Sequence, residues 1–335
     1  MRILVTGGAG YIGSVCTEVL LGLGHDVVVG DDLSTGRAEA VLSPARLVVV
    51  RRDDLGGWDR LLKSNPVDAV MHFAAIALVD ADPASLYSDN VSNTLLLLDA
   101  MRANGVHDLV FSSSAAVYGE PRSVPITEDH VCEPINAYGE SKLAIEKALK
   151  WYRRAYGMRA VMFRYFNVAG ATEWCGERRS EETHIIPLLL DTALGCRPLV
   201  TIYGDDYPTP DGTCVRDYIH VLDVVNAHIL ALERLGEVDG EAFNIGTGTG
   251  FSVKQMYDAA CRATGASIPS RIGPRRPGDP AILVAHAEKI RRVLGWQPGH
   301  SDLNTILQSA WRWRLRFVKE NHGGQQPPRA PHSDK

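Results

Sequence analysis

A tyrosine and a lysine four residues apart are the side chains in this sequence that are most clearly suited to acid-base chemistry. Tyr138 and Lys142 lie at the start of a helix-like segment, and a spacing of four places both side chains on one helix face. A phenol ordinarily titrates near pH ~10, so it acts as a base at neutral pH only if a nearby cation favours its ionised form. Lys142 can supply that charge. Taken alone, the spacing is more typical of an ordinary helix surface, so the surrounding elements must decide.

A glycine-rich turn near the start of the chain predicts a dinucleotide-binding site. Residues 3–6 form a short apolar run and a helix-like segment extends to Leu23, with Gly7, Gly10 and Gly13 between them. In a strand, turn and helix of this kind, glycines at three-residue spacing keep the turn tight and let the backbone approach a pyrophosphate. The motif by itself is a weak signal, so its context matters.

The end of the second apolar run indicates which dinucleotide binds. Residues 26–30 lead into Asp31 and Asp32. A carboxylate at this point can accept hydrogen bonds from the ribose 2'-hydroxyl of NAD, whereas it would repel the 2'-phosphate of NADP. Asp53 and Asp54 follow the third strand, where a side chain could reach the adenine, although a solvated turn explains them nearly as well.

Strand-like and helix-like segments continue to alternate through the first half of the chain. Strands are predicted at 47–50, 67–75 and 109–111, and helices at 58–63 and 83–104. Repeated strand and helix units predict an α/β fold with a Rossmann-type doubly wound parallel sheet. The apolar run in the segment 83–104 is broader than a single core stripe, which indicates either deep burial or a helix-to-helix subunit contact.

Three serines, residues 112–114, close the strand at 109–111. Ligands of open parallel sheets bind outside the carboxyl ends of the strands, so these hydroxyls lie where chemistry is expected. A serine cluster at a strand end can otherwise be a simple cap.

Composition and charge exclude several classes of protein. The 335 residues are 45% hydrophobic, with a formal net charge of -5 and a pI near 6.1, so a globular protein with a large core is expected and a nucleic-acid partner is not. No stretch approaches the ~18 apolar residues of a membrane span, which predicts a cytoplasmic protein without a membrane partner. The six cysteines lack the spacing of a zinc site or a disulfide scaffold, so no metal is expected.

With these elements in order, the sequence resembles the extended short-chain dehydrogenase/reductase family over most of its length. In that family a serine, a tyrosine and a lysine form a catalytic set beside the nicotinamide of NAD, and the matching residues here are Ser114, Tyr138 and Lys142. The resemblance therefore implies NAD as the cofactor. It also implies cofactor contacts from Gly7, Gly10, Tyr11, Ile12, Gly13, Asp31, Asp32, Asp53, Asp54, Phe73, Ala74, Asn90, Ser112, Tyr138, Lys142 and Phe166.

The two alanines that follow Ser114, Ala115 and Ala116, narrow the reaction. Sugar-nucleotide dehydratases of the family resemble this segment but carry an aspartate and a glutamate there, because the elimination of water needs a general acid and a base. The related decarboxylases tend to have a glutamate at the second position. An oxidation and re-reduction at one carbon needs only the tyrosine and the cofactor.

The segment 203–221 is similar, almost residue for residue, to the UDP-sugar epimerases of this family. Tyr203 offers an aromatic face for uracil, and the planar guanidinium of Arg216 suits a diphosphate. The alternative without a ligand makes Tyr203 a core residue and Arg216 an ion pair with Asp217. The resemblance implies substrate contacts from Ser114, Asn167, His184, Ile185, Tyr203, Arg216, Arg276 and Asp279.

Other patterns in the second half have structural interpretations. Ser252 and Gln255 have the spacing of a helix capping box, and His228 is interpreted as a packing or solvated residue of a helix. The alternating tryptophans and arginines at 311–314 are more typical of the core and surface of a terminal helix than of a nucleic-acid patch.

Three positions depart from the family pattern, and one of them is Asn93, which replaces a common glycine in the helix after Asn90. Ala77 stands where many members have a lysine beside the cofactor, which leaves the tightness of NAD binding open. Leu283 stands where some members have a tyrosine that narrows the sugar pocket, so acceptance of N-acetylated sugars is a hypothesis.

The sequence thus predicts an NAD-binding domain over 1–170, to which the chain returns around 214–250, a substrate-binding lobe over 171–320, and a disordered tail over 321–335. The resemblance implies interconversion of UDP-glucose and UDP-galactose through transient oxidation at the sugar C4, in a homodimer joined by the helices at 83–104 and 137–156. An epimerase of UDP-N-acetylglucosamine or UDP-glucuronate, or an NAD-binding regulator without turnover, stays open as an alternative.

Overall fold

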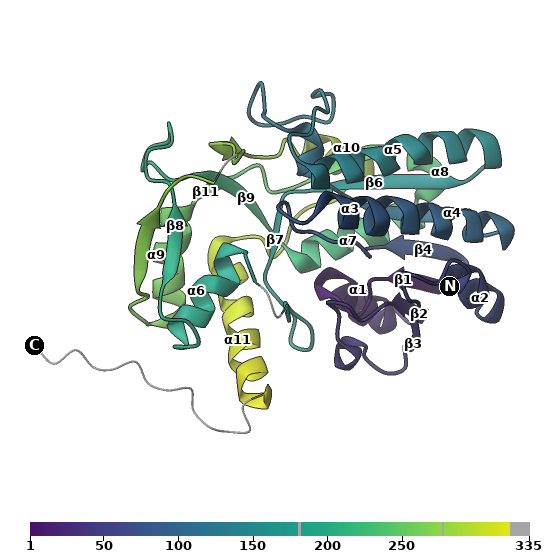
Figure 1. Cartoon of the computed structure of the whole chain (residues 1–335), viewed down its shortest axis with the longest axis horizontal. Coiled ribbons are helices and arrows are strands. Elements are labelled where there is room, and N and C mark those ends of the chain that lie inside the picture. Colours follow the sequence, from purple (N-terminus) through teal and green to yellow (C-terminus); the bar gives the residue numbers. More distant parts are fainter. Residues whose placement is uncertain (180–181, 277, 322–335) are drawn as a thin grey trace, which may run out of the picture.

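A seven-stranded parallel sheet forms the larger half of the molecule (Figure 1). The computed structural model describes residues 1–179, 182–276 and 278–321. Across the sheet the strand order is β10, β6, β5, β4, β1, β2, β3, and every neighbouring pair is parallel. The predicted doubly wound α/β fold is therefore confirmed. The strands are β1 (Arg2–Thr6), β2 (Asp26–Asp31), β3 (Arg46–Val49), β4 (Ala69–His72), β5 (Asp108–Ser114), β6 (Arg159–Tyr165) and β10 (Ala242–Ile245).

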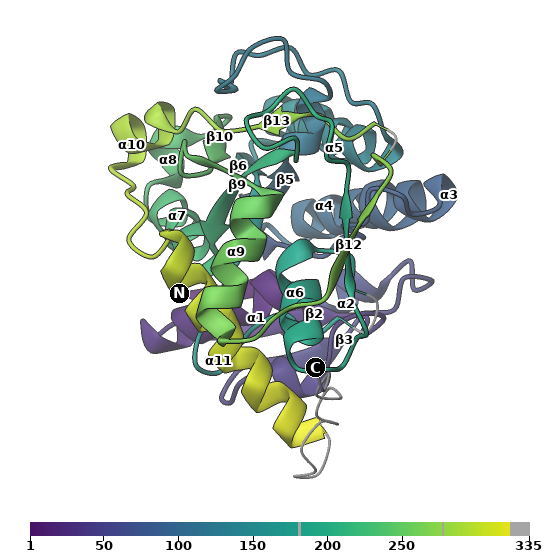
Figure 2. The ribbon, with the colours of Figure 1, turned by 90° about the vertical axis from the view of Figure 1, so that its left-hand side faces the viewer.

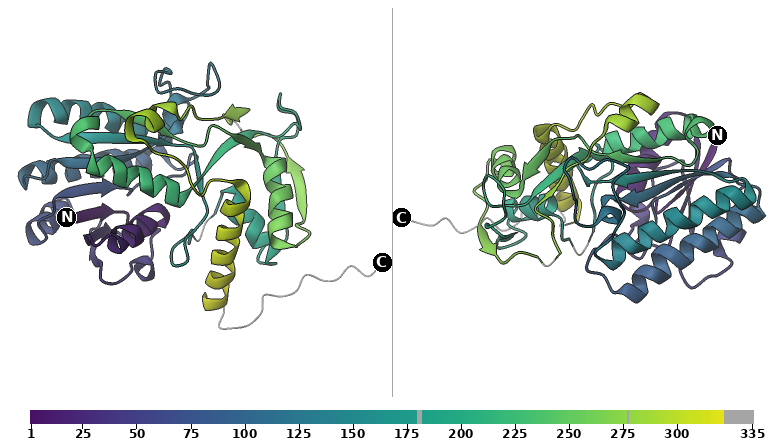
Figure 3. Two further views of the ribbon diagram at one scale, coloured as in Figure 1. Left: turned by 180° about the vertical axis from the view of Figure 1, so that it is seen from behind. Right: turned by 90° about the horizontal axis from the view of Figure 1, so that it is seen from above.

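Helices cover both faces of this sheet (Figure 3). Successive strand residues point to opposite faces, so Ile3 and Val5 pack on one helical layer and Leu4 packs on the other. The Ile3 face is covered by α1 (Tyr11–Gly22), α7 (Val221–Glu233), α8 (Leu235–Val238) and α10 (Glu288–Leu294). The Leu4 face is covered by α2 (Gly57–Ser64), α4 (Asn93–Ala103) and α5 (Ala137–Tyr156).

The smaller half combines two short sheets with three helices (Figure 2). One sheet contains β7 (Asn167–Ala169), β9 (Val215–His220), β11 (Gly250–Ser252) and β13 (Ile282–Leu283), and the other pairs β8 (Val200–Tyr203) with β12 (Ser270–Gly273). The helices are α6 (Ile185–Ala193), α9 (Val253–Thr264) and α11 (Leu303–Asn321). The capping box predicted at Ser252 and Gln255 is confirmed, since each side chain binds the backbone of the other residue at the start of α9.

The helix predicted over 83–104 is confirmed from Pro83 to Ala103, and it contains a π-helical turn that the sequence did not predict. It consists of α3 (Pro83–Leu86), a π-helical turn (Tyr87–Ser92) and α4. Within the turn, the Asn90 side chain binds the backbone of Ile76, and the Thr94 hydroxyl donates to the Asn90 carbonyl at 2.7 Å. These side-chain bonds compete with the regular helical pattern, and π-helical turns recur at functional sites.

The strand predicted over 67–75 ends earlier, at His72, because the following residues leave the sheet to lie against the glycine turn. Within the described residues, no helix is long and apolar enough to cross a membrane. The predicted disordered tail lies outside the described residues except for Asn321, where α11 ends.

Candidate active site

The turn between β1 and α1 is shaped to bring backbone close to a bound phosphate. Gly7 has φ +68°, and a Cβ at this residue would lie 2.6 Å from the Ala74 nitrogen. A Cβ at Gly13 would lie 2.2 Å from the Gly7 oxygen. Neither position accepts a side chain. Because α1 starts after Gly10, which has no side chain to cap it, the first N–H groups of the helix are available to an anion. This cradle fits the pyrophosphate of a dinucleotide.

Asp31 supports the glycine turn from the end of β2. Its carboxylate accepts hydrogen bonds from the backbone nitrogens of Ala9 at 3.0 Å and Leu33 at 2.9 Å, while burial raises its pKa. Asp32 lies beside it and pairs with Arg52 at 2.7 Å. The second strand therefore presents two carboxylates next to the turn.

Asp53 and Asp54 lie farther out, in the loop between β3 and α2. Asp53 forms an exposed ion pair with Arg51 at 3.0 Å, and Asp54 pairs with Arg60. Both carboxylates are thus bound by side chains of their own neighbourhood.

The three predicted catalytic residues come together at the carboxyl end of β5. Ser114 ends that strand, while Tyr138 and Lys142 lie on the first turns of α5. The start of α5 is fixed by Asn136, whose side chain accepts from the Gly139 nitrogen at 2.8 Å. The helix approaches the turn after β5 so closely that a Cβ on Gly139 would lie 2.3 Å from the Ala116 oxygen. This contact is what places the tyrosine beside the serine.

Burial opposes the charged forms of both Tyr138 and Lys142. It raises the pKa of Tyr138, against the lowering effects of a hydrogen bond to Ser114 and of the positive charge of Arg179. Burial also lowers the pKa of Lys142 to about 7. Lys142 donates to the Ser112 carbonyl at 2.9 Å, and its Nζ is 6.0 Å from the centre of the Tyr138 ring. Burial therefore brings the pKa of Lys142 close to neutral pH, whereas it favours the protonated form of the Tyr138 phenol.

Arg179 is a residue near the site that sequence reasoning missed. It lies in a polar, charged segment between β7 and α6, where no spacing rule distinguishes one arginine from the next. Only the folded structure shows that its charge acts on Tyr138 and on Tyr11.

Asn90 joins the loop after β4 to α5. Its Oδ1 accepts from the Ile76 nitrogen at 2.8 Å, and its Nδ2 donates to the Ile76 oxygen at 3.0 Å and to the Ser141 hydroxyl at 3.1 Å. Asn90 therefore holds the loop after β4, which contains Phe73 and Ala74, at a fixed place relative to α5.

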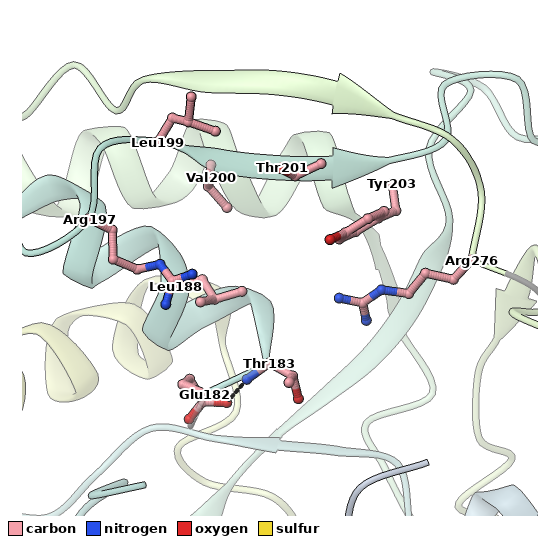
Figure 4. A pocket seen from close by; sticks show the side chains of 9 residues that line it. All are labelled: Glu182, Thr183, Leu188, Arg197, Leu199, Val200, Thr201, Tyr203 and Arg276. Carbon is pink, nitrogen blue, oxygen red and sulfur yellow. Dashed lines mark hydrogen bonds between the residues drawn. The ribbon is translucent and has the colours of Figure 1, made fainter. Parts of the chain in front are cut away.

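A cavity of about 150 Å³ lies in the smaller half (Figure 4). The Arg276 guanidinium stacks over the Tyr203 ring, 4.3 Å from its centre. Sequence reasoning named these two lining residues and missed the other seven, since no motif marks them. The lining residues are Glu182, Thr183, Leu188, Arg197, Leu199, Val200, Thr201, Tyr203 and Arg276.

Arg216 lies on β9 and pairs with Asp279. The alternative pairing with Asp217 is wrong, because the Asp217 carboxylate accepts hydrogen bonds from the backbone nitrogens of Thr247, Gly248 and Ala285. Neighbouring residues of a strand point to opposite faces, which separates Arg216 from Asp217.

The remaining predicted residues lie at the junction of the two halves. Asn167 belongs to β7, directly after Phe166 at the end of β6. His184 and Ile185 lie at the start of α6, where the His184 Nδ1 is 2.6 Å from a Glu182 oxygen. No group of three or more His, Cys, Asp or Glu side chains suited to a metal ion occurs among the described residues.

The comparisons of this chain with family models, with curated proteins and with solved structures all point to the same family. The model of the NAD dependent epimerase/dehydratase family matches residues 3–246. The chain is 49% identical to a UDP-glucose 4-epimerase of Corynebacterium glutamicum, over 97% of this chain and 99% of that protein. A crystal structure of a UDP-glucose 4-epimerase superposes with a TM-score of 0.92 at 45% identity, covering 95% of this chain and 98% of the other. The UDP-glucose 4-epimerase of Brucella ovis in complex with NAD gives a TM-score of 0.89 at 42% identity, covering 96% and 98%.

Proposed function

The chain belongs to the NAD dependent epimerase/dehydratase family, and from that premise we propose that it interconverts UDP-glucose and UDP-galactose. It is an NAD-dependent isomerase. The observation that carries the reaction type is the meeting of Ser114, Tyr138 and Lys142 at one strand end, followed by two alanines. This set can move one proton at one hydroxyl, and it holds no carboxylate for elimination.

The proton chemistry falls to Tyr138. It removes the proton of the sugar 4-hydroxyl, and Ser114, which is hydrogen-bonded to the phenol, also binds the substrate oxygen. Bound NAD supplies the reversible hydride acceptor for C4. Lys142 lies beside the phenol and favours its ionised form whenever the amine is protonated. Inversion at C4 would require the sugar ring to turn over between the two halves of the reaction.

The nucleotide part of the substrate is assigned to the smaller half. Arg216 and Arg276 carry charge that suits a diphosphate, the Tyr203 ring suits the uracil face, and Asp279 suits the ribose. A firmly held UDP and a loosely held hexose are what the turnover of the sugar ring needs. We therefore assign residues 1–170, with the return near 214–250, to NAD and residues 171–320 to the UDP-sugar.

We also propose a homodimer joined through α4 and α5. Both helices lie on the same face of the sheet. Trp151 on α5 is 61% exposed, Tyr156 at the end of α5 is also exposed, and Tyr87 is exposed on the π-helical turn that leads into α4. Large exposed apolar side chains on adjacent helices are typical of a subunit contact. Light scattering of the purified chain measures the subunit number, and Trp151→Glu is expected to give a monomer.

The six free cysteines suit a reducing compartment, which favours the cytoplasm.

One assay tests the proposed reaction. The pure protein is incubated with UDP-galactose, UDP-N-acetylgalactosamine and UDP-galacturonate, and products are separated by chromatography, with Tyr138→Phe as the control. Formation of UDP-glucose that Tyr138→Phe abolishes is the expected result. Turnover of the acetylated sugar alone, or of the galacturonate alone, would assign a different epimerase. NAD binding without any product would point to a regulator.

A further inference from the structure

A chain of buried hydrogen bonds lies behind the catalytic lysine. The Ser112 Oγ is 2.8 Å from the Tyr165 hydroxyl, the Tyr165 hydroxyl is 2.5 Å from His228 Nε2, and His228 Nδ1 is 2.9 Å from the Val224 carbonyl. The chain crosses from β5 to β6 and then to α7. His228 has 0% of its surface exposed, Ser112 5% and Tyr165 8%.

The direction of every bond in this chain follows from valence. A carbonyl only accepts, so His228 Nδ1 must carry the hydrogen that binds the Val224 oxygen. Burial lowers the pKa of His228 to about 4, so the ring is neutral and Nε2 is an acceptor. The Tyr165 hydroxyl therefore donates to Nε2, and its oxygen accepts from Ser112. One tautomer and one set of rotamers satisfy all three groups.

The same serine is connected to the catalytic helix through its backbone. The Ser112 carbonyl accepts from Lys142 Nζ at 2.9 Å. Ser112 and Ser114 lie opposite Phe163 and Tyr165 in the register of β5 and β6. The end of β5 is thus tied on one side to α7 through side chains and on the other side to Lys142 through its carbonyl.

Apolar rings isolate the imidazole from solvent. Phe73 stacks on His228 at 4.9 Å, and Phe163 lies 4.7 Å away. The titratable groups whose charges face this region are Lys142 and Tyr138 on α5, Cys16 on α1 and, beside Lys142, the buried His72 at the end of β4. A neutral, dry and fully bonded chain of this kind holds a single geometry.

We propose that Tyr165 and His228 are positioning residues for Lys142: by fixing Ser112, they fix the carbonyl that receives the lysine and hence the place of the lysine beside Tyr138. This inference rests on the proposed function, because its catalytic consequence is measured on epimerisation. Both side chains are buried, and their polar groups bind Ser112, each other and the Val224 carbonyl. Their effect passes through Ser112 to the protonation of Lys142.

The first test removes one hydroxyl. Tyr165→Phe keeps the ring and leaves the Ser112 Oγ and His228 Nε2 without their partner. We expect kcat to fall about tenfold, as for the loss of one buried hydrogen bond, while KM for UDP-galactose stays within about twofold. The pH at which kcat is half-maximal is expected to move by about half a unit or more.

A pair of substitutions at His228 separates hydrogen bonding from packing. His228→Gln offers Tyr165 an acceptor oxygen, whereas His228→Leu offers none. We expect His228→Gln to recover most of the kcat and the pH profile, and His228→Leu to behave like Tyr165→Phe. If His228→Leu does not fold, the comparison of Tyr165→Phe with His228→Gln still decides.

A readout independent of turnover distinguishes this proposal from the proposed function. In the full chain with carbon-13-labelled lysine, the Lys142 signal is assigned with Lys142→Met and titrated by NMR. Tyr165→Phe is expected to shift its midpoint. The matched control is Tyr118→Phe, which removes another buried hydroxyl, bound to Asn244 and Arg164, and is expected to leave that midpoint unchanged.

Absence of any UDP-sugar turnover by the native protein would reject the proposed function alone. Loss of stability in Tyr165→Phe and His228→Leu with an unchanged Lys142 titration and pH profile would overturn the positioning role.

Discussion

The two ends of the candidate site are built from opposite kinds of interaction. Around Lys142, polar groups are buried and uncharged or nearly so, and they bind one another through Ser112, Tyr165 and His228. In the smaller half, the groups are charged and already partnered: Arg276 lies over Tyr203 at the cavity, and Arg216 of β9 pairs with Asp279. At the Lys142 end, hydrogen bonds fix the positions of the side chains. In the smaller half, arginine side chains supply positive charge.

This difference matches what each end must tolerate. Proton transfer depends on distances of a few tenths of an ångström and on pKa values close to the working pH. Attraction between a guanidinium and a phosphate falls off slowly with distance, so a charged site accepts small displacements. A loosely held hexose between the two ends is therefore compatible with a rigid tyrosine and a firmly bound UDP.

Among the substitutions that affect one end of the site and leave the other unchanged, Tyr138→Phe is expected to have the largest effect. Removal of the phenolic hydroxyl should lower kcat by about 10³-fold, within the range of general acid-base catalysis. The dissociation constant of UDP, measured by calorimetry, should change less than about twofold, because we propose that the uridine diphosphate binds in the smaller half. A comparable loss of UDP affinity would contradict this prediction, because it would show that UDP binding depends on Tyr138.

The next effect is expected at the charged end. Arg216→Leu removes a guanidinium that is only 9% exposed and leaves Asp279 without its partner. KM for UDP-galactose should rise by about 30- to 100-fold, the value of a charge-assisted hydrogen bond or two, with little change in kcat. The matched control is Arg271→Leu on β12, an exposed arginine that binds the Thr201 hydroxyl; steady-state kinetics should show it close to the native enzyme.

A third prediction concerns pH and stability at the neutral end. The pKa of Lys142 is about 7 in the folded chain and ordinarily 10.5, so between these values the unfolded chain binds a proton that the folded chain lacks. The free energy of unfolding therefore rises with pH over this range, and the penalty of the buried charge is present in full below pH 7.

Lys142→Met removes that penalty together with the hydrogen bond to Ser112. At equal NAD occupancy, its stability should exceed the native value by about 2 kcal/mol at pH 6, and the gain should disappear toward pH 10. Urea unfolding at several pH values measures the difference. A gain independent of pH would mean that the lysine is charged throughout in the folded protein.

The smallest effect is expected from Ser252→Ala. Loss of the capping box at the start of α9 should lower the free energy of unfolding by about 1 kcal/mol. Activity should stay the same at temperatures where the protein is folded, because Ser252 lies outside both ends of the site. Thermal unfolding monitored by circular dichroism measures the change, and a fall in kcat would link α9 to catalysis.

Features determined by neighbouring residues could be predicted from the sequence. The glycine turn after β1 is one, and α5 is another, since Ala137–Tyr156 coincides with the predicted 137–156 helix. Asn136 caps its start, and Gly157 ends it with φ 66°. These signals act within a few residues of the element they define.

Features determined by distant partners could not be predicted. The π-helical turn depends on the bond from Asn90 to Ile76, across a loop. The role of His228 depends on Tyr165, 63 residues earlier in the chain. No periodicity connects such pairs, so the sequence left His228 between packing and solvent and gave Arg216 the wrong alternative partner.

The position of β10 has a consequence for how the chain is made. β10 completes the large sheet by pairing with β6, although residues 166–241 intervene and build part of the other half. Until residue 245 leaves the ribosome, β6 is an open edge strand with unpaired backbone groups, a template for pairing with other chains. A fragment ending at residue 170 keeps that edge permanently, so it should aggregate during expression. The two halves must therefore be synthesised and folded together.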